Sequence, residues 1–150
     1  MFTDKFKLIE GEELKLKLIE TVKGEYAFDL LPFYYYEILD LHNNSIGKIS
    51  FRIGFNEYTI YNGNIGYEIN DFYRGNNYSL KAMYMLKPLI LYHKFHTLFL
   101  VINEDNIASN KIALKAKGKL IGKLQVPKHH KFYHSEELTK NVYIIDVNYL

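Results

Sequence analysis

The segment from Gly63 to Ala82 constrains the fold more than any other part of this chain. A short apolar stretch at 65–69 precedes a turn rich in Gly and Asn and then a segment with helical spacing, which predicts a strand that leads directly into a helix. The first N–H groups of a helix have no partner within the helix, and the helix dipole is positive at that end. Such a turn therefore predicts a site for a phosphate group.

The chain fits a single domain that spans residues 1–150. It has 150 residues, 48% of them hydrophobic, and no internal repeat or linker, so it is long enough for a sizeable core. It has no cysteine, which excludes disulfides, thiolate zinc sites and a cysteine nucleophile. The net charge of +2 is too small to indicate a nucleic-acid partner.

The sequence predicts no membrane partner and a cytoplasmic location. No run of about 18 apolar residues is present, so no membrane-spanning helix is expected. The stretch from Met1 to Glu10 mixes charged and apolar residues and lacks the apolar core of a signal peptide.

Alternating and apolar stretches predict the strands. The period of two at Leu14–Leu18 is typical of a half-buried strand, and the turn residues at 42–45 indicate a hairpin. The segment at 20–32 fits either a loop or a short helix, and 54–62 is expected to be a connection. Further strands are expected at 34–41, 46–53, 65–69, 98–102, 120–126 and 142–147.

Two helices are expected. Apolar residues recur at helical spacing from Asn76 to about Lys94, with Pro88 as a position at which the helix can kink. The second helix is expected at 107–117, capped by Asp105 or Asn106 and ended by the following glycine. This order of elements predicts an α+β layered architecture with a mixed sheet.

The turn before the first helix resembles the pyrophosphate-binding loop of the GNAT N-acetyltransferases, which move an acetyl group from acetyl-coenzyme A (acetyl-CoA) to an amine. That loop usually has Arg or Gln, two residues, a Gly, one residue, and then Gly or Ala. Arg74 matches the first position, Asn77 stands at the expected Gly, and Ser79 stands at the small residue. Asn is the non-glycine residue that best tolerates a left-handed backbone. The alternative is an ordinary strand-to-helix turn. The resemblance implies that the pyrophosphate binds Arg74, Gly75, Asn76, Asn77, Tyr78 and Ser79.

A second segment, 101–111, resembles the part of the same family in which a strand ends and Asn, two residues, and Ser or Ala open a helix. In the family that Asn bonds the pantetheine arm of the cofactor, a role that the resemblance gives to Asn106. Ser109 and Lys111 follow on the same early turns, within reach of the arm or a phosphate. The alternatives are a plain helix cap for Asn106 and a solvated side chain for Lys111.

The resemblance extends from Ile46 to Gly118 and implies the GNAT fold. That fold is α+β, with a central mixed, mostly antiparallel sheet of about seven strands and helices packed on both faces. Its sheet is splayed between the fourth strand, here 65–69, and the fifth, here 98–102. The cofactor arm inserts in the gap and pairs with the fourth strand, here from Tyr67 to Ile69, where an amide polarises the thioester carbonyl. The sequence at 53–57 and 63–67 resembles that of a little-characterised bacterial branch of the same family, whose substrate is unassigned.

The chemistry also needs a base, because an amine must lose a proton before it attacks. The positions that hold a Glu base in many relatives are Gly63 and Val101 here. Glu68 is the leading candidate for the catalytic base, directly or through water, and Glu57 is the second. The alternative for both is a solvated or salt-bridged surface residue.

A general acid is also missing from its family position, which holds Ala113. Water, Tyr143 or Tyr149 is then the source of a proton for the departing thiolate. The late loop at 127–137 carries His129, His130 and His134, but Glu136 and Glu137 complete no known ligand pattern, so no metal is expected.

The leading hypothesis is an acetyl-CoA-dependent N-acetyltransferase in which a primary amine attacks the donor directly in a ternary complex. The amine belongs to a small molecule or to a protein, and its pocket is expected from 20–36 and 127–141. A rival is an acyl-CoA-binding sensor or assembly module without turnover. A third is a small nucleic-acid-binding domain, which the charge disfavours. Both a monomer and a homodimer fit the sequence.

Overall fold

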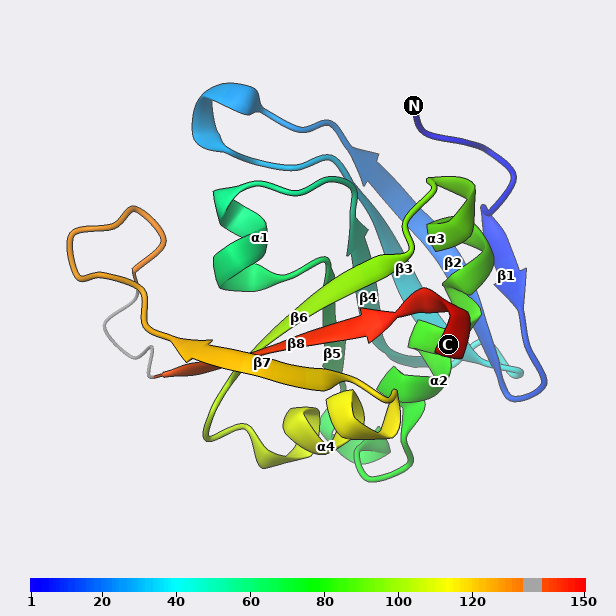
Figure 1. Cartoon of the computed structure of the whole chain (residues 1–150). Coiled ribbons are helices and arrows are strands. Elements are labelled where there is room, and N and C mark those ends of the chain that lie inside the picture. The colour runs from blue at the N-terminus through cyan, green and yellow to red at the C-terminus, as the bar shows by residue number, and fades with distance from the viewer. Residues whose placement is uncertain (134–138) are drawn as a thin grey trace.

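The computed structural model describes residues 1–133 and 139–150. Its strands form two antiparallel sheets, ordered β1-β2-β3-β4-β5 and β6-β8-β7 (Figure 1). The predicted α+β class is confirmed, and the eight strands of the described residues include β1, which was not predicted. The strands are β1 (Leu8–Glu10), β2 (Leu14–Val22), β3 (Phe33–Asp40), β4 (Ser45–Arg52), β5 (Ile65–Ile69), β6 (Thr97–Asn103), β7 (Lys119–Leu124) and β8 (Lys140–Asp146).

Alternation along the strands of the first sheet builds the core. Leu14 and Leu16 of β2, and Tyr34, Tyr36 and Ile38 of β3, are fully buried or nearly so, while their neighbours in sequence are more exposed. Helix α2 contacts β2, β4 and β5 on this sheet. The period of two that predicted a half-buried strand therefore marks the face that the helix covers.

The long helix expected from 76 to 94 is divided into α2 (Tyr78–Met85) and α3 (Lys87–Tyr92). The break falls at Leu86, whose N–H is shared between the carbonyls of Ala82 and Met83 at 3.2 Å each. Pro88 has no N–H to continue the ladder, which is the physical reason for the break. The second predicted helix is α4 (Ile107–Lys115).

Helix α1 (Glu57–Asn62) lies within the segment that was expected to be a connection. Asn56 and Thr59 form a capping box, in which each side chain accepts a hydrogen bond from the backbone N–H of the other residue. The earlier segment at 20–32, open between loop and helix, holds the end of β2 and a short 3-10 turn at Tyr26–Phe28.

The two sheets meet at Asn64, directly before β5. Asn64 N donates to Phe99 O at 2.8 Å, and Asn64 Oδ1 accepts from Phe99 N at 2.9 Å. Beyond this point β5 and β6 share no ladder, and they diverge in Figure 1. The predicted fourth and fifth strands are β5 and β6, so the expected splay is confirmed.

Candidate active site

The edge of β5 that faces the gap carries open backbone groups. Arg52 N donates to Asn64 O, which fixes the residues of β5 that bond β4. Because these groups alternate along an antiparallel strand, the N–H and C=O of Ile65, Tyr67 and Ile69 point away from β4, toward the gap. Of these groups, the carbonyl of Ile69 already accepts from Arg74 Nε at 3.2 Å. β5 has no ladder on that side. An extended ligand can therefore pair with this edge as another strand would.

A cavity of about 420 Å³, named here the outer cavity, lies between the end of β5 and the starts of α2 and α4. It brings together all the residues expected to bind the cofactor except Asn76, whose side-chain amide instead donates to the carbonyl of Tyr73 at 3.1 Å. The predicted residues that line it are Tyr67, Ile69, Arg74, Gly75, Asn77, Tyr78, Ser79, Asn106, Ser109 and Lys111.

The turn into α2 has the backbone that the sequence leads one to expect. Asn77 is left-handed, with φ 59° and ψ 26°, and its side chain does not cap the helix. Its Oδ1 accepts instead from Lys115 Nζ at 2.8 Å. Within residues 1–133 and 139–150, no side chain therefore bonds the first N–H groups of α2, which stay available to an anion.

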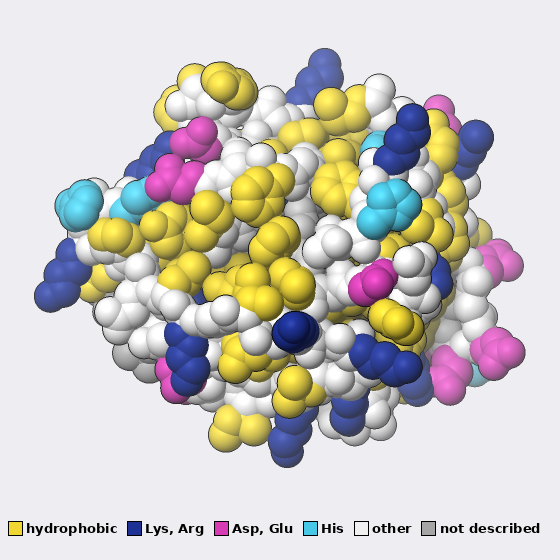
Figure 2. All heavy atoms as spheres, in the orientation of Figure 1, with side chains coloured by type: hydrophobic (Ala, Val, Ile, Leu, Met, Phe, Trp, Pro, Cys, Tyr) yellow, Lys and Arg dark blue, Asp and Glu magenta, His cyan; other side chains and the backbone are white. Residues whose placement is uncertain are grey.

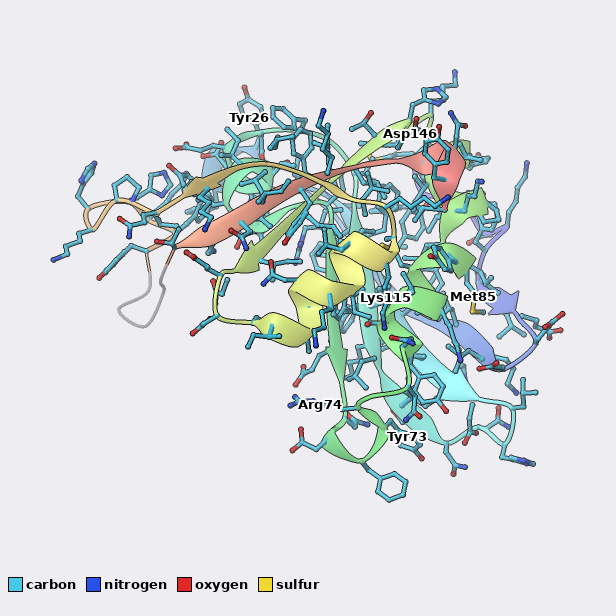
Figure 3. All side chains as sticks on the ribbon, turned by 60° about the horizontal axis from the view of Figure 1, so that its bottom comes forward. Tyr26, Tyr73, Arg74, Met85, Lys115 and Asp146 are labelled. Carbon is cyan, nitrogen blue, oxygen red and sulfur yellow. The ribbon has the colours of Figure 1, made fainter. Side chains whose placement is uncertain are left out.

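Cations surround the outer cavity. Arg74, Lys111 and Lys115 line it, and Glu68 is the one carboxylate among its described lining residues. Lys and Arg side chains gather over α4 in Figure 2, and Figure 3 shows Lys115 projecting from α4 toward the start of α2. Lys115 was not predicted, although its spacing of four from Lys111 places both on one helix face.

Asn106 is the N-cap of α4, because its Oδ1 accepts from Ser109 N at 3.2 Å. With Ser109 and Tyr67, it also lines a second cavity of about 270 Å³, named here the inner cavity, which lies between β5 and β6. These three shared residues join the two cavities. The others that line the inner cavity are Arg52, Tyr61, Asn62, Ile65, Gly66, Leu100, Val101, Ile102, Asn103 and Lys140.

The hydroxyl of Tyr67 is buried at this junction and has no hydrogen-bond partner among the described residues. Burial raises the pKa of Tyr67, and the nearby hydroxyls of Ser109 and Ser79 offset part of that rise without lying in hydrogen-bonding geometry. A buried polar atom left unpaired costs free energy. The sequence indicated only the backbone of Tyr67, since nothing in it shows where the phenol lies.

The candidate bases lie apart from each other. Glu68 is exposed, faces Lys48 across the β4–β5 ladder, and lines the outer but not the inner cavity. Glu57 Oε1 lies 2.6 Å from His130 Nε2. His130 Nδ1 accepts from Phe132 N at 3.1 Å, so the ring proton is assigned to Nε2, which donates to Glu57.

Tyr61 connects this pair to the cleft. Its ring lies 4.9 Å from the ring of His130, and Tyr61 lines the inner cavity. The two segments expected to form the acceptor pocket also meet here, because Lys131 forms an ion pair with Asp29. Among the described residues that line the inner cavity, none is a carboxylate.

Neither tyrosine considered as a general acid lines the outer or the inner cavity. The Tyr143 hydroxyl donates to Asn110 Oδ1 at 2.7 Å, and Tyr149 is 62% exposed with Lys117 Nζ 5.4 Å from its ring centre. Both are thus engaged elsewhere, and their sequence positions near the C-terminus carried no information about that.

Within residues 1–133 and 139–150, no group of three or more His, Cys, Asp or Glu side chains is placed to hold a metal ion. His129 is exposed and His130 bonds Glu57, while His134, Glu136 and Glu137 lie outside the described residues. In the same described part of the chain, no helix is long and apolar enough to cross a membrane.

No family model and no curated protein matches the sequence. Several solved structures match in three dimensions. A GNAT-family acetyltransferase from Bacillus anthracis has a TM-score of 0.67 and 16% identity, over 94% of this chain and 99% of that one. RimL, a ribosomal alpha-N-protein acetyltransferase in complex with coenzyme A, has a TM-score of 0.68 and 14% identity, over 95% and 99%.

A third match, provisionally described as an acetyltransferase, comes from Acinetobacter baylyi, with a TM-score of 0.58 and 19% identity. The alignment covers 76% of this chain, which spans only 63% of the length of that protein. At these identities the likeness concerns the fold. The divided sheet, the turn into α2 and the matched structures together show that this chain has the GNAT fold.

Proposed function

We propose that this chain is an N-acetyltransferase that transfers an acetyl group from acetyl-CoA to a primary amine in a ternary complex. One observation carries the proposal: an open strand edge and an uncapped helix start face two joined cavities between them. A long ligand with phosphates at one end and an extended amide arm at the other fits this arrangement. The likeness to a structure solved with coenzyme A supports the same ligand.

The described residues fit that ligand group by group. The free N–H groups of α2, with Arg74, Lys111 and Lys115, would hold the phosphates. The backbone of Tyr67 and Ile69 would pair with the amide arm, as would the side chains of Asn106 and Ser109. The unpaired Tyr67 hydroxyl is the observation that most favours a polar ligand at the junction.

Acetyl-CoA supplies an acetyl thioester. In the overall reaction the C–N bond forms, the C–S bond breaks, and one proton passes from the amine nitrogen to the sulfur. The N–H groups of β5 that point toward the gap would stabilise negative charge on the carbonyl oxygen. Since the inner cavity has no carboxylate among its described residues, we propose Glu68, or Glu57 held by His130, as a proton acceptor that acts through water.

The proposal takes residues 1–150 as one acyl-CoA N-acyltransferase domain of a cytoplasmic bacterial enzyme. The enzyme would be a monomer or a homodimer, and it would need no metal, nucleic-acid or membrane partner. The acceptor is a small-molecule amine or a protein amine. The alternative is an acyl-CoA-binding sensor or assembly module without turnover, which the lack of a carboxylate in the described lining of the inner cavity favours.

The first experiment is thermal unfolding with and without acetyl-CoA. At about 100 times its dissociation constant, a ligand adds roughly 2.7 kcal/mol, so the midpoint should rise by several degrees. Lys111→Glu should reduce the rise, because Lys111 lines the outer cavity and its side chain takes part in none of the ion pairs among the described residues. Lys128→Glu is the matched control, since Lys128 is exposed and lines neither cavity.

Equal midpoints with and without acetyl-CoA would refute the cofactor site. If binding is present, transfer to a panel of amines separates the two functions. An enzyme should lose turnover, but not binding, in Glu68→Gln or Glu57→Gln. Binding without transfer to any amine would favour the sensor.

A further inference from the structure

Arg52 brings a positive charge to the inner cavity and has no carboxylate partner in the part of the chain that the structure describes. It is the last residue of β4 and lines the cavity, and burial lowers the pKa of Arg52. Its Nη1 donates to the carbonyls of Asn62 at 3.1 Å and Gly63 at 3.2 Å, and its guanidinium lies 5.4 Å from the ring centre of Tyr58. None of the ion pairs among the described residues includes Arg52.

The unused part of this guanidinium faces the gap. Both hydrogen bonds come from Nη1, while Nε and Nη2 make none among the described residues. Nη2 lies over β5 at Gly66, where a Cβ atom would come within 2.7 Å of it. Gly66 therefore leaves space for the guanidinium beside the inner cavity. The free donors form the planar fork that binds a carboxylate through two parallel hydrogen bonds.

A second basic residue lines the inner cavity. Lys140 also lines it, with Nζ donating to Tyr61 O at 2.9 Å. An arginine remains charged in a protein, and a desolvated charge without a counter-charge is costly. The guanidinium of Arg52, which has no counter-charge among the described residues, therefore favours an anion in this cavity.

Arg52 lies on the acceptor side of the cleft. Tyr67, Asn106 and Ser109 join the inner cavity to the outer one, where the phosphates are proposed to bind, and Arg52 is not among these shared residues. The inner cavity is also small, about 270 Å³, which suits a compact acceptor.

We propose that Arg52 binds a carboxylate of the acceptor, so that the substrates of this chain are small amino acids and related amines that carry a carboxylate, rather than polyamines. This inference rests on the proposed acetyl transfer. Arg52 would act as a specificity residue that holds the acceptor, while its bonds from Nη1 keep the guanidinium in place.

The test compares acetyl transfer to matched acceptors, each an amino acid and its carboxamide, such as glycine and glycinamide. Thiol release reports the reaction without a contribution from protein thiols, because the chain has no cysteine, and release measured without an acceptor is subtracted as hydrolysis. The wild-type protein should prefer the carboxylate by at least about tenfold in kcat/KM, although the carboxamide holds more free amine at neutral pH. Arg52→Gln should abolish the preference, chiefly through KM, and Arg52→Lys should retain part of it.

Two controls separate this inference from the proposed function. Lys48→Gln alters an exposed cation on the same face of β4 that lines neither cavity, and it should keep the preference. The acetyl-CoA-induced rise in melting temperature should be the same in Arg52→Gln as in the wild type. A purely structural role of Arg52 would lower rates with both members of a pair and leave their ratio unchanged.

Two results would overturn the inference. One is a preference of the wild-type protein for the carboxamide. The other is an Arg52→Gln variant that binds acetyl-CoA normally and keeps the wild-type ratio of kcat/KM between amino acid and carboxamide. If no transfer is detected, the probes are N-acetylglycine and N-acetylglycinamide, followed by chemical-shift changes in the protein. Binding that requires both the carboxylate and Arg52 would support the inference even then, whereas equal binding of the two probes would refute it.

Discussion

At the scale of single residues, Gly63 explains why this chain lacks a base where the family resemblance leads one to expect it. Gly63 has φ +74°, and a Cβ atom there would lie 2.7 Å from Phe99 O and 3.1 Å from Val101 N. A side chain at this position would push β6 away from the junction at Asn64. The absence of a glutamate is thus a requirement of packing where the two sheets meet.

We therefore expect Gly63→Ala to destabilise the fold more than a change in backbone conformation alone would. The matched control is Gly75→Ala, since Gly75 has φ +88° but open space where a Cβ would stand. Strain at such a backbone costs about 1–3 kcal/mol, and Gly63→Ala should cost more because of the clash. Urea unfolding of both variants measures the difference, and equal losses would contradict the clash.

Residues whose role depends on local backbone could be predicted, and those that depend on distant partners could not. Asn77 and Asn106 were identified because a left-handed turn and a helix cap depend on residues that are neighbours in the sequence. The free Nε and Nη2 donors of Arg52 depend on the space left by Gly66, fourteen positions further along the chain, and on the geometry of two strands. The Glu57–His130 pair joins positions 73 apart. No local pattern reports such contacts.

At the scale of elements, the turn into α2 keeps its shape with Asn77 in place of the glycine of the family pattern. The left-handed conformation is held with help from Lys115, whose Nζ lies 2.8 Å from Asn77 Oδ1. Long periodic segments were predicted well, while α1 and the division of the long helix show that a capping box and a proline shift the boundaries.

Asn77→Gly should leave acetyl-CoA affinity within about threefold of the wild type, because glycine reaches the same backbone without strain. Asn77→Val should lower stability by about 1–2 kcal/mol, since a β-branched residue resists a left-handed conformation. Calorimetric titration and thermal unfolding provide the two readouts. A tenfold gain in affinity for Asn77→Gly would show instead that Asn77 impairs the loop.

At the scale of the whole molecule, Tyr34 connects three separate parts of the chain. Its hydroxyl accepts from Thr3 N at 2.9 Å and lies 2.8 Å from His93 Nε2, so it links the N-terminal segment, β3 and the end of α3. Burial and the nearby charged N-terminus lower the pKa of His93 in the folded protein. The neutral His93 ring can accept a hydrogen bond from the Tyr34 hydroxyl at Nε2, whereas a protonated ring cannot.

Stability should therefore fall as the pH drops below about 6.5, the ordinary pKa of histidine, because the unfolded chain then binds a proton that the folded chain resists. Above that pH the contribution of His93 is fully present. His93→Gln, which keeps an acceptor but does not titrate, should flatten this part of the melting profile. His42→Gln, at an exposed turn, serves as the control. A profile unchanged by His93→Gln would exclude this histidine as the cause.

The separation of β5 from β6 also affects the tendency of this protein to aggregate. A bare strand edge normally invites pairing with a neighbouring chain and so leads to aggregation. Here the bare edge of β5 faces β6 inside the gap rather than the outside of the molecule. A thin, extended small molecule can enter there, but a foreign strand with side chains on both faces would have to separate the two sheets. The same geometry that exposes hydrogen-bonding groups to a ligand thus shields them from misassembly.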